Sequence, residues 1–95
     1  MITYKAAYWF LKEGGVHAEL LDFPNVITCA ETLRGARRMI ASCLEDMADF
    51  FVSEGKALPV PNPQLTRDDA DLEEPIHLLL TAAFHVKIVP QKAAP

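Results

Sequence analysis

The chain has 95 residues, of which 51% are hydrophobic and 23% are charged, and its formal net charge at pH 7 is −4. This length fits one domain, and the composition is that of a globular protein and not of a disordered tail. Domains that grip nucleic acid usually carry a basic face, so the acidic balance argues against direct nucleic-acid binding.

The first third of the chain is predicted to form a three-stranded meander. Residues 2–11 alternate between two sets of side chains and are rich in Tyr, Trp and Phe, which is typical of a strand. Gly14 and Gly15 supply the positive φ that a tight hairpin needs. Residues 16–23 then form the antiparallel partner strand, and residues 26–29 form a short third strand.

A long amphipathic helix is predicted to run from Leu33 to Glu54. Thr32 is a suitable N-cap, and Gly55 stands where a helix end favours a left-handed residue. The apolar side chains recur at helical spacing, which predicts that this face covers the sheet. They are Leu33, Ala36, Ile40, Cys43, Leu44, Met47 and Phe51.

The last part of the chain is predicted to be a connection, a strand and a short tail. Residues 56–75 contain a proline-rich piece and an acidic piece, and we expect them to form an extended loop facing water. Alternation returns over residues 76–89, which is long for one strand. Residues 90–95 form the tail.

That length leaves two alternatives for the last strand. A bend near residues 81–83 can fold its end back onto the same sheet. Otherwise its unpaired edge pairs outside the monomer, in a homodimer or higher oligomer that buries Phe84, Val86 and Ile88. In both cases the chain is one domain of residues 1–95, an α+β two-layer sandwich of order β-β-β-α-β.

The expected localisation follows from the first residues, the longest charge-free stretch and the cysteines. The first residues lack the order of a signal peptide, and the longest charge-free stretch is too short to span a bilayer. Cys29 and Cys43 match neither a CxxC motif nor a disulfide framework, and they are expected to be buried free thiols. We therefore expect a cytoplasmic protein without membrane contact.

Several short motifs occur in a fixed order over residues 2–61. They are Glu13-Gly14-Gly15, then residues 22–28 (DFPNVIT), then Glu31-Thr32-Leu33, then Gly55 and Pro59-Val60-Pro61. Together they resemble the HicB family of bacterial antitoxins. The departures are Asn25 and Ala30, where the family usually has Gly, and Gly35, where a capping Glu would be usual.

The resemblance implies a truncated RNase H-like fold and a toxin-neutralising role. Its partner would be a small basic ribonuclease toxin of the HicA type, which is blocked by steric occlusion. Many family members continue into a module that binds operator DNA. This chain resembles the toxin-neutralising half alone, so we expect no direct nucleic-acid binding.

No enzymatic chemistry is predicted. RNase H-type cleavage needs three or four converging carboxylates that hold two metals, and the meander offers only Glu13, Glu19 and Asp22. His77 and His85 would lie ~26 Å apart on one strand, too far to share a zinc ion. We expect no catalytic residue, no metal and no cofactor.

The charges on the helix are segregated along its length. Arginines crowd the N-terminal half and carboxylates the C-terminal half, which opposes the helix macrodipole. A merely solvated face explains this pattern, and so does a face aimed at a partner. The candidate partner-binding residues are Arg34, Arg38, Glu45 and Asp49.

Two functional hypotheses remain open from the sequence. The first is a non-catalytic, HicB-like antitoxin domain that binds a toxin. The second is an orphan structural module that self-associates and has no toxin partner.

Overall fold

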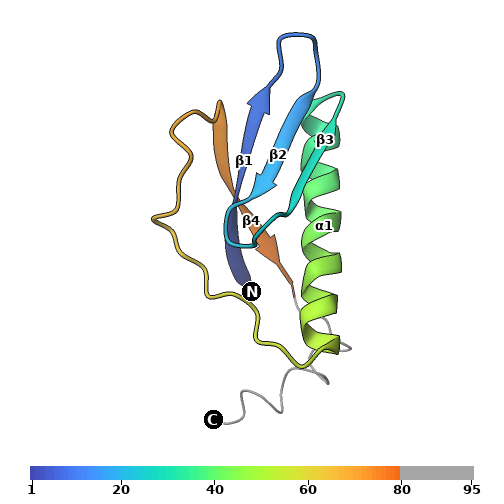
Figure 1. Cartoon of the computed structure of the whole chain (residues 1–95), viewed down its shortest axis with the longest axis vertical. Helices are drawn as coiled ribbons and strands as arrows, with labels where there is room; N and C mark the ends of the chain where they lie inside the picture. The colour runs from blue at the N-terminus through green and yellow to red at the C-terminus, as the bar shows by residue number, and fades with distance from the viewer. Residues whose placement is uncertain (80–95) are drawn as a thin grey trace.

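Strand β1 (Ile2–Phe10) is the central organiser of the fold, because other strands pair with both of its edges. The structure is a computed structural model that describes residues 1–79. Its four strands form one antiparallel sheet of order β3-β2-β1-β4, and a single helix lies against one face (Figure 1). The predicted α+β fold with a three-stranded meander, one helix and a fourth strand is confirmed.

The predicted hairpin joins β1 to β2 (Val16–Leu20). Gly14 and Gly15 have φ values of 97° and 98°, which side chains rarely tolerate. Two backbone hydrogen bonds of Leu11 close the turn. The Leu11 carbonyl accepts from the Gly14 N–H at 3.0 Å, and the Leu11 N–H donates to the Gly15 carbonyl at 3.0 Å.

Strand β3 (Ile27–Ala30) follows a turn in which Asn25 has a φ of 61°. Asparagine enters this left-handed region more readily than other non-glycine residues, so it replaces the glycine of the family pattern at little cost. β3 pairs only with β2 among the described strands and forms one edge of the sheet.

Helix α1 (Leu33–Ser53) begins at the predicted residue and ends one residue before the predicted end, with Glu54 as its C-cap. The Thr32 hydroxyl accepts from the Gly35 N–H at 3.0 Å, and Gly55 beyond the helix end has a φ of 70°. A Cβ atom on Gly35 would lie 3.2 Å from the Ala30 Cβ. Glycine therefore allows the helix to start close against β3, which explains the absence of a capping glutamate there.

The core lies between α1 and the face of the sheet that it covers. Ile40 and Leu44 are 0% and 1% exposed, and the half-buried Leu33, Met47 and Phe51 pack against the same cluster. The buried face of α1 also includes three smaller side chains. The contact between helix and sheet is therefore centred closer to these residues than the predicted apolar face implies. These are Ala36, Ala48 and Val52.

Strand β4 (Leu72–Leu78) begins earlier than the sequence suggests, and the expectation that residues 72–75 form a water-facing loop is wrong. Pro75 misled that expectation because proline cannot donate to a strand ladder. It pairs with Lys5, whose own N–H and carbonyl are directed to Asp22 and Leu21 on the other side of β1. No N–H is needed from Pro75 toward β1, so it fits this edge strand.

Strand β4 ends at Leu78, which pairs with Ile2 at the start of β1. Leu79 is exposed and lies beyond the strand, and residues 80–89 of the predicted strand, including Phe84, Val86 and Ile88, lie outside the described residues. The two alternatives for that segment, and the predicted tail, also lie outside them.

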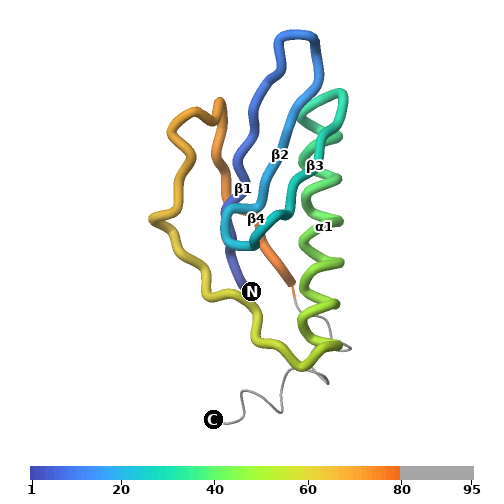
Figure 2. The backbone as a smooth tube through the Cα atoms, in the orientation of Figure 1, coloured from blue at the N-terminus to red at the C-terminus, as the bar shows by residue number. Residues whose placement is uncertain are grey.

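The connection between α1 and β4 follows an extended path along the side of the sheet away from the helix layer (Figure 2). Near its start the Tyr4 hydroxyl donates to the Pro59 carbonyl at 2.8 Å. Within residues 1–79, no helix is long and apolar enough to cross a membrane.

We expect Leu44→Ala to lower the free energy of unfolding by ~2–5 kcal/mol, because it removes a fully buried side chain and leaves a cavity. Met39→Ala is the matched control, since Met39 is 46% exposed on the same helix. Urea denaturation followed by circular dichroism measures both. Equal losses for the two variants would contradict the observed helix orientation.

Candidate functional site

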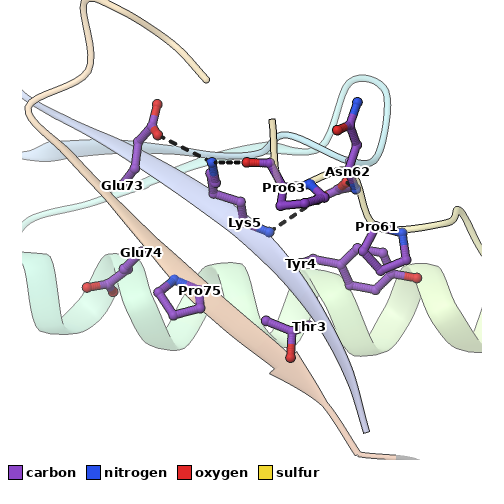
Figure 3. A pocket seen from close by; sticks show the side chains of 10 residues that line it. Thr3, Tyr4, Lys5, Pro61, Asn62, Pro63, Glu73, Glu74 and Pro75 are labelled. Atoms are coloured by element: carbon purple, nitrogen blue, oxygen red, sulfur yellow. Dashed lines mark hydrogen bonds and ion pairs between the residues drawn. The ribbon is translucent and has the colours of Figure 1, made fainter. Parts of the chain in front are cut away.

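The sheet face opposite α1 carries a polar network centred on Lys5. The Lys5 Nζ donates to the carbonyls of Pro63 at 3.0 Å and Leu65 at 2.7 Å, and it lies 3.8 Å from the Glu73 Oε1 (Figure 3). Because Lys5 is on β1 and Glu73 on β4, the ammonium ties the connection to two strands at once.

Asp22 is a second anchor for the connection. Its carboxylate accepts from the backbone N–H of Lys5 at 3.1 Å and from that of Asn62 at 2.8 Å. Asn62 in turn accepts through its side-chain oxygen from the Gln64 N–H at 3.0 Å, which forms a local turn. A carboxylate with two backbone donors holds this part of the chain in a defined position.

These residues border an open groove of about 470 Å³ between the connection and strands β1 and β4 (Figure 3). The charged groups that reach it are already engaged with the chain itself, as described for Lys5 and Asp22. The groove therefore serves to seat the connection. Its lining is Thr3, Tyr4, Lys5, Asp22, Pro61, Asn62, Pro63, Glu73, Glu74 and Pro75.

Glu73 completes the attachment of the connection. It accepts from the Arg67 backbone N–H at 2.6 Å and from the Thr66 hydroxyl at 2.7 Å. These hydrogen bonds favour the ionised carboxylate and lower its pKa, the Arg67 bond most strongly. The Arg67 Nε also lies 3.7 Å from the Glu19 Oε1 on β2, so the connection reaches across the sheet.

On the helix-covered face, Glu74 links β4 to α1. Arg37 binds it through two hydrogen bonds of 2.7 and 2.9 Å, and this pairing lowers the pKa of Glu74. Burial, together with the nearby Glu74, raises the pKa of Tyr8 to about 12. Arg37 therefore serves the fold, although it lies among the arginines that crowd the N-terminal half of the helix.

The candidate partner-binding residues lie on the side of α1 that faces away from the sheet. Arg34, Arg38, Glu45 and Asp49 are all exposed. Successive members are separated by four or seven residues, so they follow one stripe along the helix. The structure brings them onto a common surface and leaves Arg37 outside it.

The meander carboxylates are used individually. Glu19 lies 3.0 Å from the His17 Nε2 and near Arg67, while Asp22 holds the connection. Glu13 is exposed in the hairpin turn. In the part of the chain that the structure describes, no three His, Cys, Asp or Glu side chains are grouped so as to hold a metal ion.

The expectation of two buried thiols is wrong for Cys29, which is exposed on edge strand β3. The side chain lies on the face opposite the helix, because its neighbour in the register is His17 on that face. Cys43 is half-buried beside the core. His77 lies 2.9 Å from the Thr3 hydroxyl, and His85 is outside the described residues.

The anchors Lys5, Asp22 and Asn62 were not singled out from the sequence. Lys5 fits the alternating strand pattern, and Asp22 lies in a motif whose role is a turn. Only Asn62-Pro63 carries a local turn signal. Their long-range partners lie 17 to 68 residues away, so no spacing rule finds these contacts.

The lowered pKa values of Glu73 and Glu74 predict a specific acid sensitivity. Their stabilisation is present above the ordinary glutamate pKa of about 4.3 and is lost as the pH falls through the lower folded-state values. We expect Glu74→Gln to lower the melting temperature at pH 7 and to converge with the parent at low pH.

Thermal melts from pH 7 to pH 3 measure this effect, with Glu13→Gln as the control for the loss of an exposed carboxylate. A constant difference between Glu74→Gln and the parent across that range would contradict the ionic role of the Arg37 pairing.

Comparison with known proteins gives relatives of one kind. The chain is 30% identical over 87 residues to Antitoxin HicB of Escherichia coli strain K12 and, with the same values, to Antitoxin HicB of Escherichia coli O157:H7. The matches cover 86% of this chain and 62% of each relative. No family model matches the chain. The resemblance read from the motifs is confirmed, and the chain is HicB-like over the part of these antitoxins that it matches.

Proposed function

We propose that this chain is a non-catalytic antitoxin module that binds a small basic ribonuclease toxin of the HicA type and inhibits it by occlusion. The observation that carries the proposal is the match to curated relatives named as antitoxins over 86% of the chain. The chain spans 62% of their length, so it offers one part of such a protein for this role.

The charge balance supports a basic partner. Thirteen acidic residues against nine basic ones give the net charge of −4. Opposite net charges accelerate the encounter of two proteins, and salt screens that attraction. Exposed carboxylates also lie on the connection at Asp68 and Asp69. The cytoplasm is the compartment in which such a module would meet an RNA-cleaving toxin.

Inhibition by occlusion is supported by how the polar residues are used. Glu19, Asp22 and Glu73 each hold a neighbouring group of the same chain, so the fold uses them as structural anchors. A module that acts by covering a toxin needs a stable surface and no reactive group. The firmly attached connection meets the first of these needs.

The alternative is an orphan module that self-associates without a toxin. The segregated charges on α1 favour it, because they provide a surface that does not require a basic partner. One observation distinguishes the two functions. The antitoxin function requires that a short basic chain encoded next to this one binds to it, and the orphan module does not.

The direct test is co-expression of the full chain with that neighbouring basic chain. We expect the two to co-purify, and RNA cleavage by the basic chain to fall linearly until one antitoxin is present per toxin. An intact toxin mass after inhibition distinguishes occlusion from modification. Failure to co-purify and to inhibit would favour the orphan module.

The chain alone is expected to leave RNA and DNA intact in Mg²⁺ or Mn²⁺. Gel assays with purified protein measure this result, and Glu19→Gln and Asp22→Asn provide the comparison. Cleavage by the parent that disappears in either variant would overturn the non-catalytic proposal.

A further inference from the structure

The surface of α1 that faces away from the sheet carries a stripe with an ordered sequence of charges. We use the name outer stripe for Arg34, Arg38, Ala41, Ser42, Glu45 and Asp49. At about 100° per residue these positions fall within an arc of roughly 100° around the helix. Every one of them is exposed. The stripe is therefore a continuous surface that the described fold leaves open.

The charge order along the stripe is unfavourable within a single chain. The first turn of α1 has no acidic residue and the last turn has no basic one, so no charge at either end complements the helix dipole. Within residues 1–79, Arg34, Arg38 and Glu45 have no ion-pair or hydrogen-bond partner for their side chains. Asp49 has an interaction within its own chain, so Arg38 and Glu45 are the two charges of opposite sign on which the surface chiefly depends.

The same order becomes favourable when two copies of the helix lie antiparallel. The midpoint between Ala41 and Ser42 is equally far in sequence from Arg38 and Glu45. It is also equally far from Arg34 and Asp49. A two-fold axis at this midpoint therefore places every arginine of the stripe level with a carboxylate of the other copy.

The centre of the stripe suits close contact. Ala41 and Ser42 are small and exposed, and in the antiparallel arrangement each lies level with the other in the second copy. Small residues at a crossing point allow helix axes to approach to about 8–10 Å. At that separation, arginine and carboxylate side chains on either side of the crossing can reach one another.

We propose that the outer stripe is a self-association surface whose partner is a second copy of this chain, with the two α1 helices antiparallel. A parallel arrangement would bring arginine against arginine. A uniformly basic partner would be repelled by half of the stripe. Only a surface with the opposite charge order fits all four charges, and the antiparallel copy supplies it.

This association is expected to be weak and sensitive to salt, because ion pairs on an exposed surface are screened and contribute modestly. Their main effect is to fix the orientation of the two helices. The proposal does not depend on the toxin-binding function, since it uses only the charges and exposure of α1.

Charge reversals on the stripe test the proposal, and the double variant does so at the net charge of the parent. Arg38→Glu should weaken self-association by about tenfold, because each dimer loses two ion pairs and gains repulsion. Glu45→Arg should weaken it similarly. The double variant R38E/E45R recreates both pairs in reversed polarity, so it should restore the parent association.

Sedimentation equilibrium of the full 10.5 kDa chain in low-salt buffer measures these constants, and circular dichroism confirms that each variant is folded. Lys12→Glu is the matched control, because it changes the net charge as Arg38→Glu does but lies in the hairpin turn. It should leave self-association unchanged.

Three results would overturn the proposal. The parent could be a monomer at all concentrations, or Arg38→Glu could associate as the parent does, or the double variant could fail to recover. An association that ignores Arg38→Glu but is abolished by Phe84→Asp would instead assign self-association to the chain beyond β4.

Discussion

The packing of α1 against the central strands is the contact on which the rest of the structure depends. Ile40 and Leu44 are buried against a sheet face that contains Ala6 and Ala18, both 0% exposed. Small side chains at the sheet centre let the large helix residues fill the layer between them, which is how a dense core is built. The helix and sheet are thereby fixed relative to each other. The Arg37–Glu74 pairing and the closely packed start of α1 at Gly35 both require that relative position.

Sequence patterns predicted the regular elements because each element has a local cause. Alternation defined β1, the glycine pair defined its turn, and Thr32 marked the start of α1. The beginning of β4 was missed for an equally physical reason. Its first residue, Leu72, is followed by two glutamates and a proline, which favour a loop locally. Pairing with an existing strand, and the use of Glu73 and Glu74 as anchors, override that preference.

The candidate site was predicted unevenly. Helical spacing was enough to place the exposed charges of the outer stripe on one surface, because that relation is local. It also left Arg37 outside that surface, but it could not identify the partner of Arg37, because Glu74 is 37 residues away in the sequence. The groove anchors at Lys5 and Asp22 were missed for the same reason. They bind backbone groups of a connection that is distant in the sequence. Residues of every type have a backbone carbonyl and nearly all have an N–H, so residue identity does not reveal such contacts.

The self-association proposal uses only the outer stripe, so it is compatible with toxin binding on another side of the molecule. The outer stripe faces away from the sheet, so pairing of two α1 helices leaves the opposite sheet face of each copy, which the connection partly covers, outside the contact. That face carries the exposed Cys29 and Ile27 on edge strand β3, next to the half-buried His17 on β2. A dimer formed through α1 would present two such faces directed away from its axis. Under the antitoxin proposal, each copy binds one toxin. Linking two binding surfaces increases the apparent affinity only for partners that are themselves linked. Toxin binding by one copy is then independent of the other, unless the toxin also associates with itself.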